Sequence, residues 1–357
     1  MGRKMDPRFR GDDMKKNPLV LFIVGPTASG KSALAVALAK KLDGEILSAD
    51  SMLVYKGMDI GTAKPTKKER GDIPHYGLDL IPPTKSFSVF AYRQYALKVL
   101  KDIVRRGKIP IVAGGTGFYV RALLEGLSPL PGTHAAIRAK LEREAQAKGL
   151  PALYKRLRKL DPRRAKAIGP HNQRRIIRAL EIYLASGKKP SEPAPKTPGL
   201  RELGYKPFVI GLHRDREALY QKINQRVDTM FRKGLVREVT RLARKKLSKT
   251  ALQGVGYKET LDWIKNKSSK IPMSFPRVIS GNPERGSPIK AFGDDKARGT
   301  PVSINDVKNT IKQTTRHFAK RQWTWFKRES GICWVWWPEG ASLKSICDLV
   351  IQKFQRL

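Results

Sequence analysis

Short, continuous apolar runs alternate with helical segments in the first third of the chain. The runs have the length and composition of strands buried on both faces, and they are 19–24, 45–48 and 109–113. The helical segments are 33–42, 88–106 and 118–124. Because strands that alternate with helices pair in parallel through right-handed crossovers, we expect an α/β core with a parallel sheet over 18–132.

Helices rich in Arg and Lys follow this core and predict a helical insertion over 133–206. The helices are expected at 133–148, 151–160 and 172–184, and the five prolines of 186–207 indicate a connector. After the connector we expect the chain to return to the core over 207–337. The elements predicted there are a strand at 208–211, helices at 216–233, 235–246 and 304–328, and a strand at 333–337, before a helical tail over 338–357.

Two segments show neither a helical nor a strand period. Residues 1–17 are charged, and we interpret them as a disordered or mis-annotated N-terminal extension. Residues 267–301 hold five prolines and four glycines, a composition that favours a disordered surface insertion over a core element.

Charge is the unusual feature of the composition. The 357 residues include 72 Lys and Arg against 31 Asp and Glu, a formal net charge of +41. Such an excess repels itself unless a polyanion offsets it, so a nucleic acid or an anionic surface is the expected partner, although a generally basic proteome would also explain it.

The remaining composition points to a reducing compartment. Cys333 and Cys347 cannot form a disulfide framework, and no Cys/His cluster has zinc-ligand spacing. The chain also shows no signal peptide and no apolar run long enough to cross a membrane. We therefore expect a cytoplasmic protein without a membrane partner. We also expect the protein to be a monomer.

The first apolar run ends at a phosphate-binding motif of the form Gly-x4-Gly-Lys-Ser. Its backbone N–H groups can surround phosphates, its Lys supplies a positive charge, and its Ser hydroxyl can ligate Mg2+. The following helix directs its N-terminal partial charge at the same anion. The motif predicts a P-loop fold with a diphosphate or nucleotide site formed by Gly25, Pro26, Thr27, Ala28, Ser29, Gly30, Lys31 and Ser32.

The residues that follow the other two apolar runs limit which reactions a phosphate-binding site could catalyse here. Hydrolases with this loop usually place an Asp at the end of a neighbouring strand to hold Mg2+, whereas the run 109–113 ends in Gly114-Gly115-Thr116. The comparable acid is Asp50, which follows the run 45–48 and can serve as an outer metal ligand or as a general base. The residues alone leave both roles open.

An ordered series of motifs closely resembles the bacterial tRNA dimethylallyltransferases, also called tRNA isopentenyltransferases or the IPP transferase family. The resemblance covers 18–266 and 304–337. It is carried by 25–32, Ser48-Ala49-Asp50-Ser51, 54–65, 114–119, 121–127, 172–175, Gly254-Val255-Gly256-Tyr257-Lys258 and 319–326.

The resemblance implies transfer of a dimethylallyl group from its diphosphate to N6 of the adenosine immediately 3′ of a tRNA anticodon. Asp50 is then the candidate base that takes the N6 proton, and Thr116 the group that orients the amine. Lys31, the loop N–H groups, a Mg2+ ion held partly by Ser32, and Arg226 would stabilise the departing pyrophosphate.

The same resemblance implies a tRNA anticodon arm as partner, with the target base extruded into the crevice. The residues expected to contact it are Asp50, Ser51, Met52, Leu53, Thr116, Arg138, Gln173, Arg174, Arg175, Ile176, Ile177, Gln253, Gly254, Val255, Gly256, Tyr257 and Lys258. Many relatives carry Gln in place of Leu53, so one polar RNA contact is expected to be missing. Basic residues near Trp323 and Trp325 could bind RNA, but core packing is the expected role of the two tryptophans.

Two other functions fit parts of the sequence. A P-loop kinase of a nucleoside or small alcohol shares the loop and the sheet but uses ATP as donor. An RNA-binding protein with a vestigial nucleotide site would explain the charge. Release of pyrophosphate rather than ADP distinguishes the transferase from the kinase.

Overall fold

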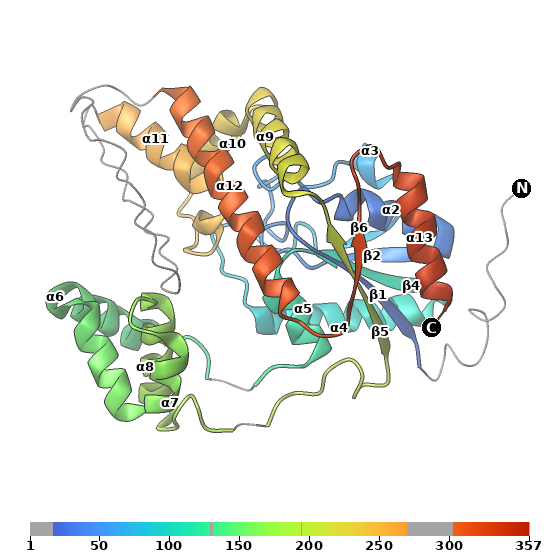
Figure 1. Ribbon diagram of the computed structural model, residues 1–357. Coiled ribbons are helices and arrows are strands. Elements are labelled where there is room, and N and C mark those ends of the chain that lie inside the picture. Colours follow the sequence, from blue (N-terminus) through green and yellow to red (C-terminus); the bar gives the residue numbers. More distant parts are fainter. Residues whose placement is uncertain (1–16, 129–130, 194, 270–302, 357) are drawn as a thin grey trace, which may run out of the picture. The chain divides into compact units, whose positions relative to one another are not determined.

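The computed structural model describes residues 17–128, 131–193, 195–269 and 303–356, and it forms two compact units (Figure 1). Of the described residues, the larger unit holds those before residue 125 and those from residue 200 onward, and the smaller unit holds those between 125 and 199. The segments predicted to be disordered fall largely outside the described residues, at 1–16 and 270–302. No helix of the described part is long and apolar enough to cross a membrane.

The larger unit is built on a six-stranded parallel sheet with the strand order β3-β2-β4-β1-β5-β6. This arrangement confirms the predicted α/β fold with its parallel sheet. The strands are β1 (Leu19–Val24), β2 (Gly44–Ser48), β3 (His75–Tyr76), β4 (Ile109–Gly114), β5 (Lys206–His213) and β6 (Ile332–Trp336).

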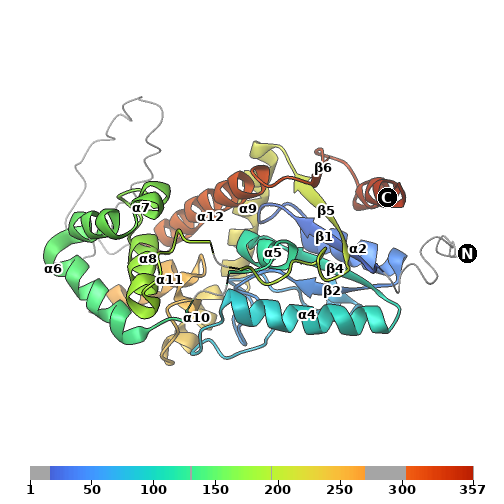
Figure 2. The same cartoon turned by 90° about the horizontal axis from the view of Figure 1, so that it is seen from below.

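Helices cover both faces of the sheet, as Figures 1 and 2 show. Alternate residues of β1 point to opposite faces, so Leu21 and Ile23 pack with α2 and α13, whereas Val20 and Phe22 pack with α4 and α5. The helices of this unit are α2 (Lys31–Leu42), α3 (Lys67–Arg70), α4 (Val89–Arg105), α5 (Gly117–Leu124), α9 (Arg216–Arg232), α10 (Leu235–Ala243), η2 (Ala251–Gln253), α11 (Tyr257–Ser269), α12 (Ile304–Lys327) and α13 (Leu343–Gln355).

A third apolar cluster joins the later helices to the loop 54–65. Val54, Tyr55 and Met58 of the loop are fully buried there, among side chains of α9, α10, α11 and α12. Full burial of each such side chain stabilises the packed state by roughly 1.5–3 kcal/mol. A segment without regular structure is thereby held in one place beside the sheet.

The smaller unit is helical and has its own core. It consists of α6 (Ala135–Leu160), α7 (Pro162–Ile168) and α8 (Gln173–Ser186). Leu141, Leu153, Leu157 and Leu180 pack at its centre. The two helices predicted at 133–148 and 151–160 are joined across a kink at Gly149, whose φ of 77° is accessible to glycine at little cost.

The boundaries of this unit differ from the predicted insertion at 133–206. The smaller unit is 125–199, and Leu200 is already buried in the core of the larger unit, while Lys206 begins β5. The five prolines of 186–207 led us to predict a connector through residue 207, so the return to the core at Leu200 was not predicted.

Other differences concern short elements and element ends. The two-residue β3 and the four-residue α3 are too short to show a period. Helix α11 continues to Ser269, so residues 267–269 are helical rather than part of a disordered insertion.

Candidate active site

The phosphate-binding motif forms a tight loop between β1 and α2. Gly25 has a φ of 138°, and a Cβ there would lie 2.6 Å from the Leu212 carbonyl oxygen. Gly30 has a φ of 103°, and its Cβ would lie 2.7 Å from the Trp337 ring. Both glycines are therefore required by backbone conformation and by close packing. Within the loop, Lys31 Nζ donates a hydrogen bond to the Pro26 carbonyl at 2.6 Å.

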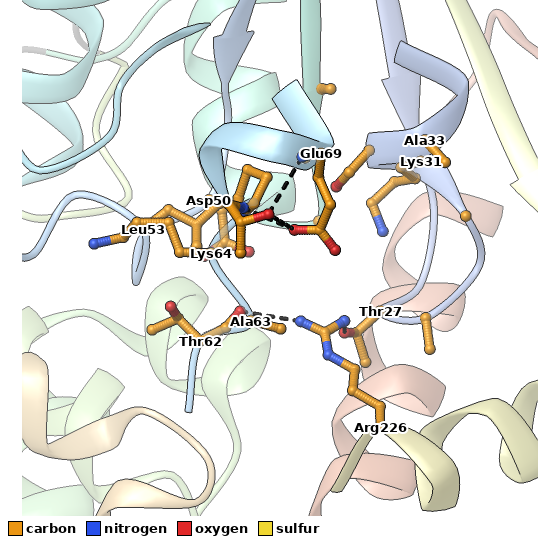
Figure 3. A pocket seen from close by; sticks show the side chains of 18 of the residues that line it. Thr27, Lys31, Ala33, Asp50, Leu53, Thr62, Ala63, Lys64, Glu69 and Arg226 are labelled. Carbon is orange, nitrogen blue, oxygen red and sulfur yellow. Dashed lines mark hydrogen bonds between the residues drawn. The ribbon is translucent and has the colours of Figure 1, made fainter. Parts of the chain in front are cut away.

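A cavity of about 610 Å³ opens at this loop, on the side where the parallel strands end. Residues far apart in the sequence line it, and Figure 3 shows the side chains of 18 of them. They include Thr27, Lys31 and Ser32 of the loop, Asp50 and Leu53 after β2, Thr62 and Glu69, Gly114 and Gly115 after β4, Arg226 of α9 and Gln322 of α12. The structure thus brings Lys31, Ser32, Asp50 and Arg226 to one cavity.

Arg226 is fixed by two hydrogen bonds across the cavity. Nη1 donates to Thr27 Oγ1 at 3.1 Å, and Nη2 donates to the Thr62 carbonyl at 3.0 Å. The guanidinium therefore connects the phosphate-binding loop with the loop 54–65 (Figure 3).

Lys31 and Arg226 are two of the cations that line the cavity, and both side chains are half-buried. Burial lowers the pKa of Lys31 to about 7; the Asp50 carboxylate opposes this shift, and the Arg226 charge adds to it. Burial also lowers the pKa of Arg226, against the opposing effects of Asp50 and Glu69. An anion in this cavity would relieve the repulsion between two desolvated positive charges.

Asp50 lies in the bend that follows β2. Its Oδ1 accepts the Met52 backbone N–H at 2.8 Å, a local turn that fixes the carboxylate at the cavity wall. The Asp50 carboxylate interacts electrostatically with both Lys31 and Arg226. The geometry is compatible with a base facing a phosphate site and also with a metal ligand.

Thr116 is joined to the same bend. Its backbone N–H donates to the Ala49 carbonyl at 3.1 Å, and its Oγ1 accepts the Ser51 N–H at 3.0 Å. A Cβ on Gly114 would lie 2.2 Å from the Ala49 carbonyl oxygen. The glycine that replaces a strand-end carboxylate is therefore required by the close approach of the β2 and β4 ends.

Gln322 is a site residue that the sequence analysis missed. Its Oε1 accepts the Thr27 N–H at 2.7 Å and its Nε2 donates to the Gly115 carbonyl at 2.8 Å, so it joins the phosphate-binding loop to the turn after β4. The side chain is only 6% exposed. A single Gln within a basic helix has no sequence pattern that would identify it as a site residue, although Gln322 lies in the motif 319–326.

The predicted RNA residues of the larger unit meet at one place. Met52 Sδ lies 3.2 Å from the position of a Cβ on Gly254, so the bend after β2 and the segment 253–258 are in contact. Gln253 and Lys258 are exposed, whereas the Tyr257 side chain is buried. Tyr257 is thus unavailable for direct contact with RNA.

The predicted RNA residues of the smaller unit divide into exposed and structural ones. Gln173, Arg174 and Arg175 are exposed in the first turn of α8. Ile176 and Ile177 are buried in the core of the unit, so their side chains cannot reach an RNA.

Arg138 has a structural partner within the smaller unit. Its Nη2 donates to the fully buried Glu181 carboxylate at 2.7 Å, and Arg178 lies 3.0 Å from the same oxygen. Side-chain hydrogen bonds from Arg178 and Arg138, together with the His134 backbone N–H, hold the pKa of Glu181 below its usual value despite its burial.

The two tryptophans of α12 pack within the larger unit. Trp323 contacts His213 and Trp334 at ring-centroid distances of 4.3 and 4.7 Å. The Trp325 ring lies against Gly117 and under the Arg121 guanidinium. Trp325 therefore packs against the core of the larger unit, as expected. Trp323 is half-buried and also lines a second cavity with Arg216, Tyr220 and Lys320.

Comparison with known proteins gives consistent matches over the chain. A family model described as IPP transferase matches residues 53–329, and one described as isopentenyl transferase matches residues 18–73. A tRNA dimethylallyltransferase of Halothermothrix orenii is 40% identical over 323 residues, which cover 89% of this chain and 87% of that protein. One from Thermoanaerobacter sp. is 42% identical over 321 residues, covering 88% and 90%.

Solved structures match as well. The full-length tRNA isopentenylpyrophosphate transferase of Bacillus halodurans superposes with a TM-score of 0.62 at 33% identity, covering 96% of this chain and 97% of that one. A eukaryotic dimethylallyltransferase acting on tRNA gives a TM-score of 0.71 at 27% identity, covering 93% of this chain and 77% of that one.

Proposed function

The chain belongs to the IPP transferase family, and we propose that it transfers a dimethylallyl group from dimethylallyl diphosphate to N6 of the adenosine immediately 3′ of the anticodon, in tRNAs that read codons beginning with U. The observation that carries this proposal is the single cavity in which Lys31, Arg226 and Asp50 meet. The alternative of a P-loop kinase is not favoured, because the relatives with about 40% identity are named tRNA dimethylallyltransferases.

The donor diphosphate would lie at the phosphate-binding loop. The loop N–H groups, the N-terminus of α2, Lys31 and Arg226 supply positive potential there before any substrate binds. As the allylic C–O bond breaks, its electron pair stays on the leaving pyrophosphate, and cations that are already fixed stabilise that charge without reorganising. The two hydrogen bonds of Arg226 give it this fixed position.

The acceptor adenine would enter from the side of Asp50. A new C–N bond forms between N6 and the allylic carbon, and the N6 proton passes to the Asp50 carboxylate. The amino group of adenine is a weak nucleophile because its lone pair is delocalised, so removal of that proton as the bond forms lowers the barrier. Thr116, hydrogen-bonded to the same bend, would orient the amine.

A Mg2+ ion fits this cavity as an ion held mainly by the substrate. Among the described residues, no group of three or more His, Cys, Asp or Glu side chains could hold a metal on its own. The Ser32 hydroxyl and the Asp50 carboxylate nevertheless line the same cavity, and Mg2+ commonly takes few protein ligands and completes its shell with phosphates and water. When bound, it would neutralise charge on the diphosphate.

The anticodon arm of a tRNA is the proposed RNA partner. The net charge of +41 supports a polyanionic partner, and Gln173, Arg174, Arg175, Gln253 and Lys258 are exposed. Ser51, Met52 and Leu53 lie beside Asp50, where an extruded base would be held. We further propose that the enzyme acts as a monomer in the cytoplasm.

The experiment that tests the function follows both products. Purified protein is incubated with Mg2+, dimethylallyl diphosphate and an unmodified tRNA that reads a UNN codon, and the RNA is digested for mass spectrometry. We expect N6-dimethylallyladenosine and an equal amount of pyrophosphate. A transcript with guanosine at the target position is the matched control. No alkylated adenosine from any tRNA of this class, together with ADP formed from ATP, would favour the kinase instead.

A further inference from the structure

A buried carboxylate outside the cavity holds the loop on which Arg226 depends. Glu238 of α10 is 6% exposed and accepts hydrogen bonds from three successive backbone N–H groups. Its Oε2 accepts the N–H groups of Asp59 at 3.0 Å and Ile60 at 2.9 Å, and its Oε1 accepts that of Gly61 at 3.2 Å. Three consecutive N–H groups around one anion fix the backbone of residues 59–61 relative to α10.

Tyr257 completes this arrangement from α11. Its hydroxyl donates to Glu238 Oε1 at 2.6 Å, and the Thr62 backbone hydrogen-bonds to the same hydroxyl. A Cβ on Gly61 would lie 2.5 Å from the Tyr257 ring, so the loop backbone rests directly on that ring. Burial and the neighbouring carboxylate raise the pKa of Tyr257, which keeps its hydroxyl protonated and able to donate.

The loop held in this way ends at a hydrogen-bond partner of the cavity arginine. The Thr62 carbonyl accepts from Arg226 Nη2 at 3.0 Å, one residue after the last N–H bound by Glu238. Thr27 of the phosphate-binding loop supplies the other partner of Arg226. A shift of residues 59–62 would therefore remove one of the two bonds that orient the guanidinium.

We propose that Glu238 is a positioning residue which, with Tyr257, sets the place of Arg226 in the donor site through the backbone of residues 59–62. This inference rests on the proposed function, in which Arg226 binds the donor diphosphate. Glu238 does not itself line the cavity. Its carboxylate acts through the loop 59–62. The Arg226 guanidinium keeps a fixed orientation only if its hydrogen-bond partner, the Thr62 carbonyl, is itself held in place.

The test compares two isosteric substitutions of buried carboxylates. Glu238→Gln replaces one accepting oxygen with an NH2 group that faces N–H donors, so the loop must shift. Glu45→Gln is the matched control, because Glu45 is 4% exposed and also accepts from a tyrosine hydroxyl, that of Tyr76 at 3.0 Å. Glu45 lies at the end of β2 remote from Asp50.

Binding of inorganic pyrophosphate with Mg2+ is measured by calorimetry, and kcat and KM for the donor are measured alongside. We expect both variants to lower Tm. Glu238→Gln should weaken pyrophosphate binding at least tenfold and lower kcat, whereas Glu45→Gln should leave the Kd for pyrophosphate within twofold of that of the parent protein. Equal pyrophosphate affinity in the two variants would overturn the proposal.

A double-mutant cycle tests the route through Arg226. In an Arg226→Ala background, Glu238→Gln should cause no further loss of pyrophosphate affinity, and full additivity would overturn the proposal. If Glu238→Gln does not fold, Tyr257→Phe removes the 2.6 Å bond to Glu238 and the bond from the Thr62 backbone to the same hydroxyl. This variant should weaken pyrophosphate binding about threefold or more, and an unchanged Kd would count against the proposal. The outcomes that decide this proposal are pyrophosphate affinities. Absence of transferase activity would therefore refute the proposed function and leave these binding tests intact.

Discussion

Gly114→Ala tests why this protein has a glycine where related phosphate-loop enzymes carry a strand-end carboxylate. The added Cβ would lie 2.2 Å from the Ala49 carbonyl oxygen and 2.7 Å from the Ala49 Cα. Both neighbours belong to backbone that leads directly into Asp50, so neither can rotate away as a flexible side chain would. The ends of β2 and β4 must therefore separate by about 1 Å to restore an ordinary van der Waals contact.

The expected loss of stability follows from the hydrogen bonds that such a separation would lengthen. Backbone N–H groups donate three of the hydrogen bonds that join the two strand ends: Ala49 N–H to the Ala113 carbonyl at 2.9 Å, Thr116 N–H to the Ala49 carbonyl at 3.1 Å, and Ser51 N–H to Thr116 Oγ1 at 3.0 Å. At about 0.5–1.5 kcal/mol each, the loss of these three bonds should lower the free energy of unfolding by about 1.5–4.5 kcal/mol. Displacement of Asp50 by about 1 Å should lower kcat about 100-fold.

Urea unfolding and single-turnover alkylation of tRNA measure the two effects. Gly132→Ala is the matched control, because a Cβ at Gly132 meets no atom within 4 Å, and it should leave both quantities unchanged. A Gly114→Ala variant with parental kcat would refute the reasoning, since it would show that the close approach of the two strand ends does not position Asp50.

The sequence predicted the elements whose patterns are local and strong. The run 19–24 became β1, and the phosphate-binding motif directly after it became the tight loop of the cavity. Asp50 was identified because it follows an apolar run, and the carboxyl ends of parallel strands meet at one edge of a sheet. Arg226 and the RNA residues came from resemblance to a family rather than from their own pattern.

What the sequence did not predict depends on contacts between distant segments. Gln322 lies 295 residues from Thr27, and nothing in its neighbourhood indicates that its amide joins two loops. Glu238 resembles any other acid on an amphipathic helix until the structure places three N–H groups around it. Ile176 and Ile177 were assigned to RNA with the exposed first turn of α8, although the helical period turns both of them into the core.

Three further predictions concern the groups of the cavity. Asp50→Asn should lower kcat by about 100- to 10,000-fold in a steady-state assay with donor KM changed less than about threefold; equal losses in both would make Asp50 a metal ligand. Arg226→Ala should raise the donor KM and weaken pyrophosphate binding by about tenfold or more in calorimetry. Unchanged values would show that Arg226 does not bind the diphosphate. The pKa of Lys31 is about 7 in the free protein and an anion favours the charged amine, so binding of an unreactive donor analogue takes up a proton. Its affinity should therefore fall up to about tenfold per pH unit above pH 7.5, where the analogue itself is fully ionised, and Lys31→Met should abolish that dependence.

A crystal structure with Mg2+ and dimethylallyl S-thiolodiphosphate, a donor analogue with a poorer leaving group, would show directly whether the donor lies between the phosphate-binding loop and Asp50. We expect a diphosphate bound by the loop 25–32, Lys31 and Arg226, with the allylic carbon directed across the cavity toward Asp50. A diphosphate bound away from Lys31 and Arg226, or an allylic chain directed away from Asp50, would contradict it.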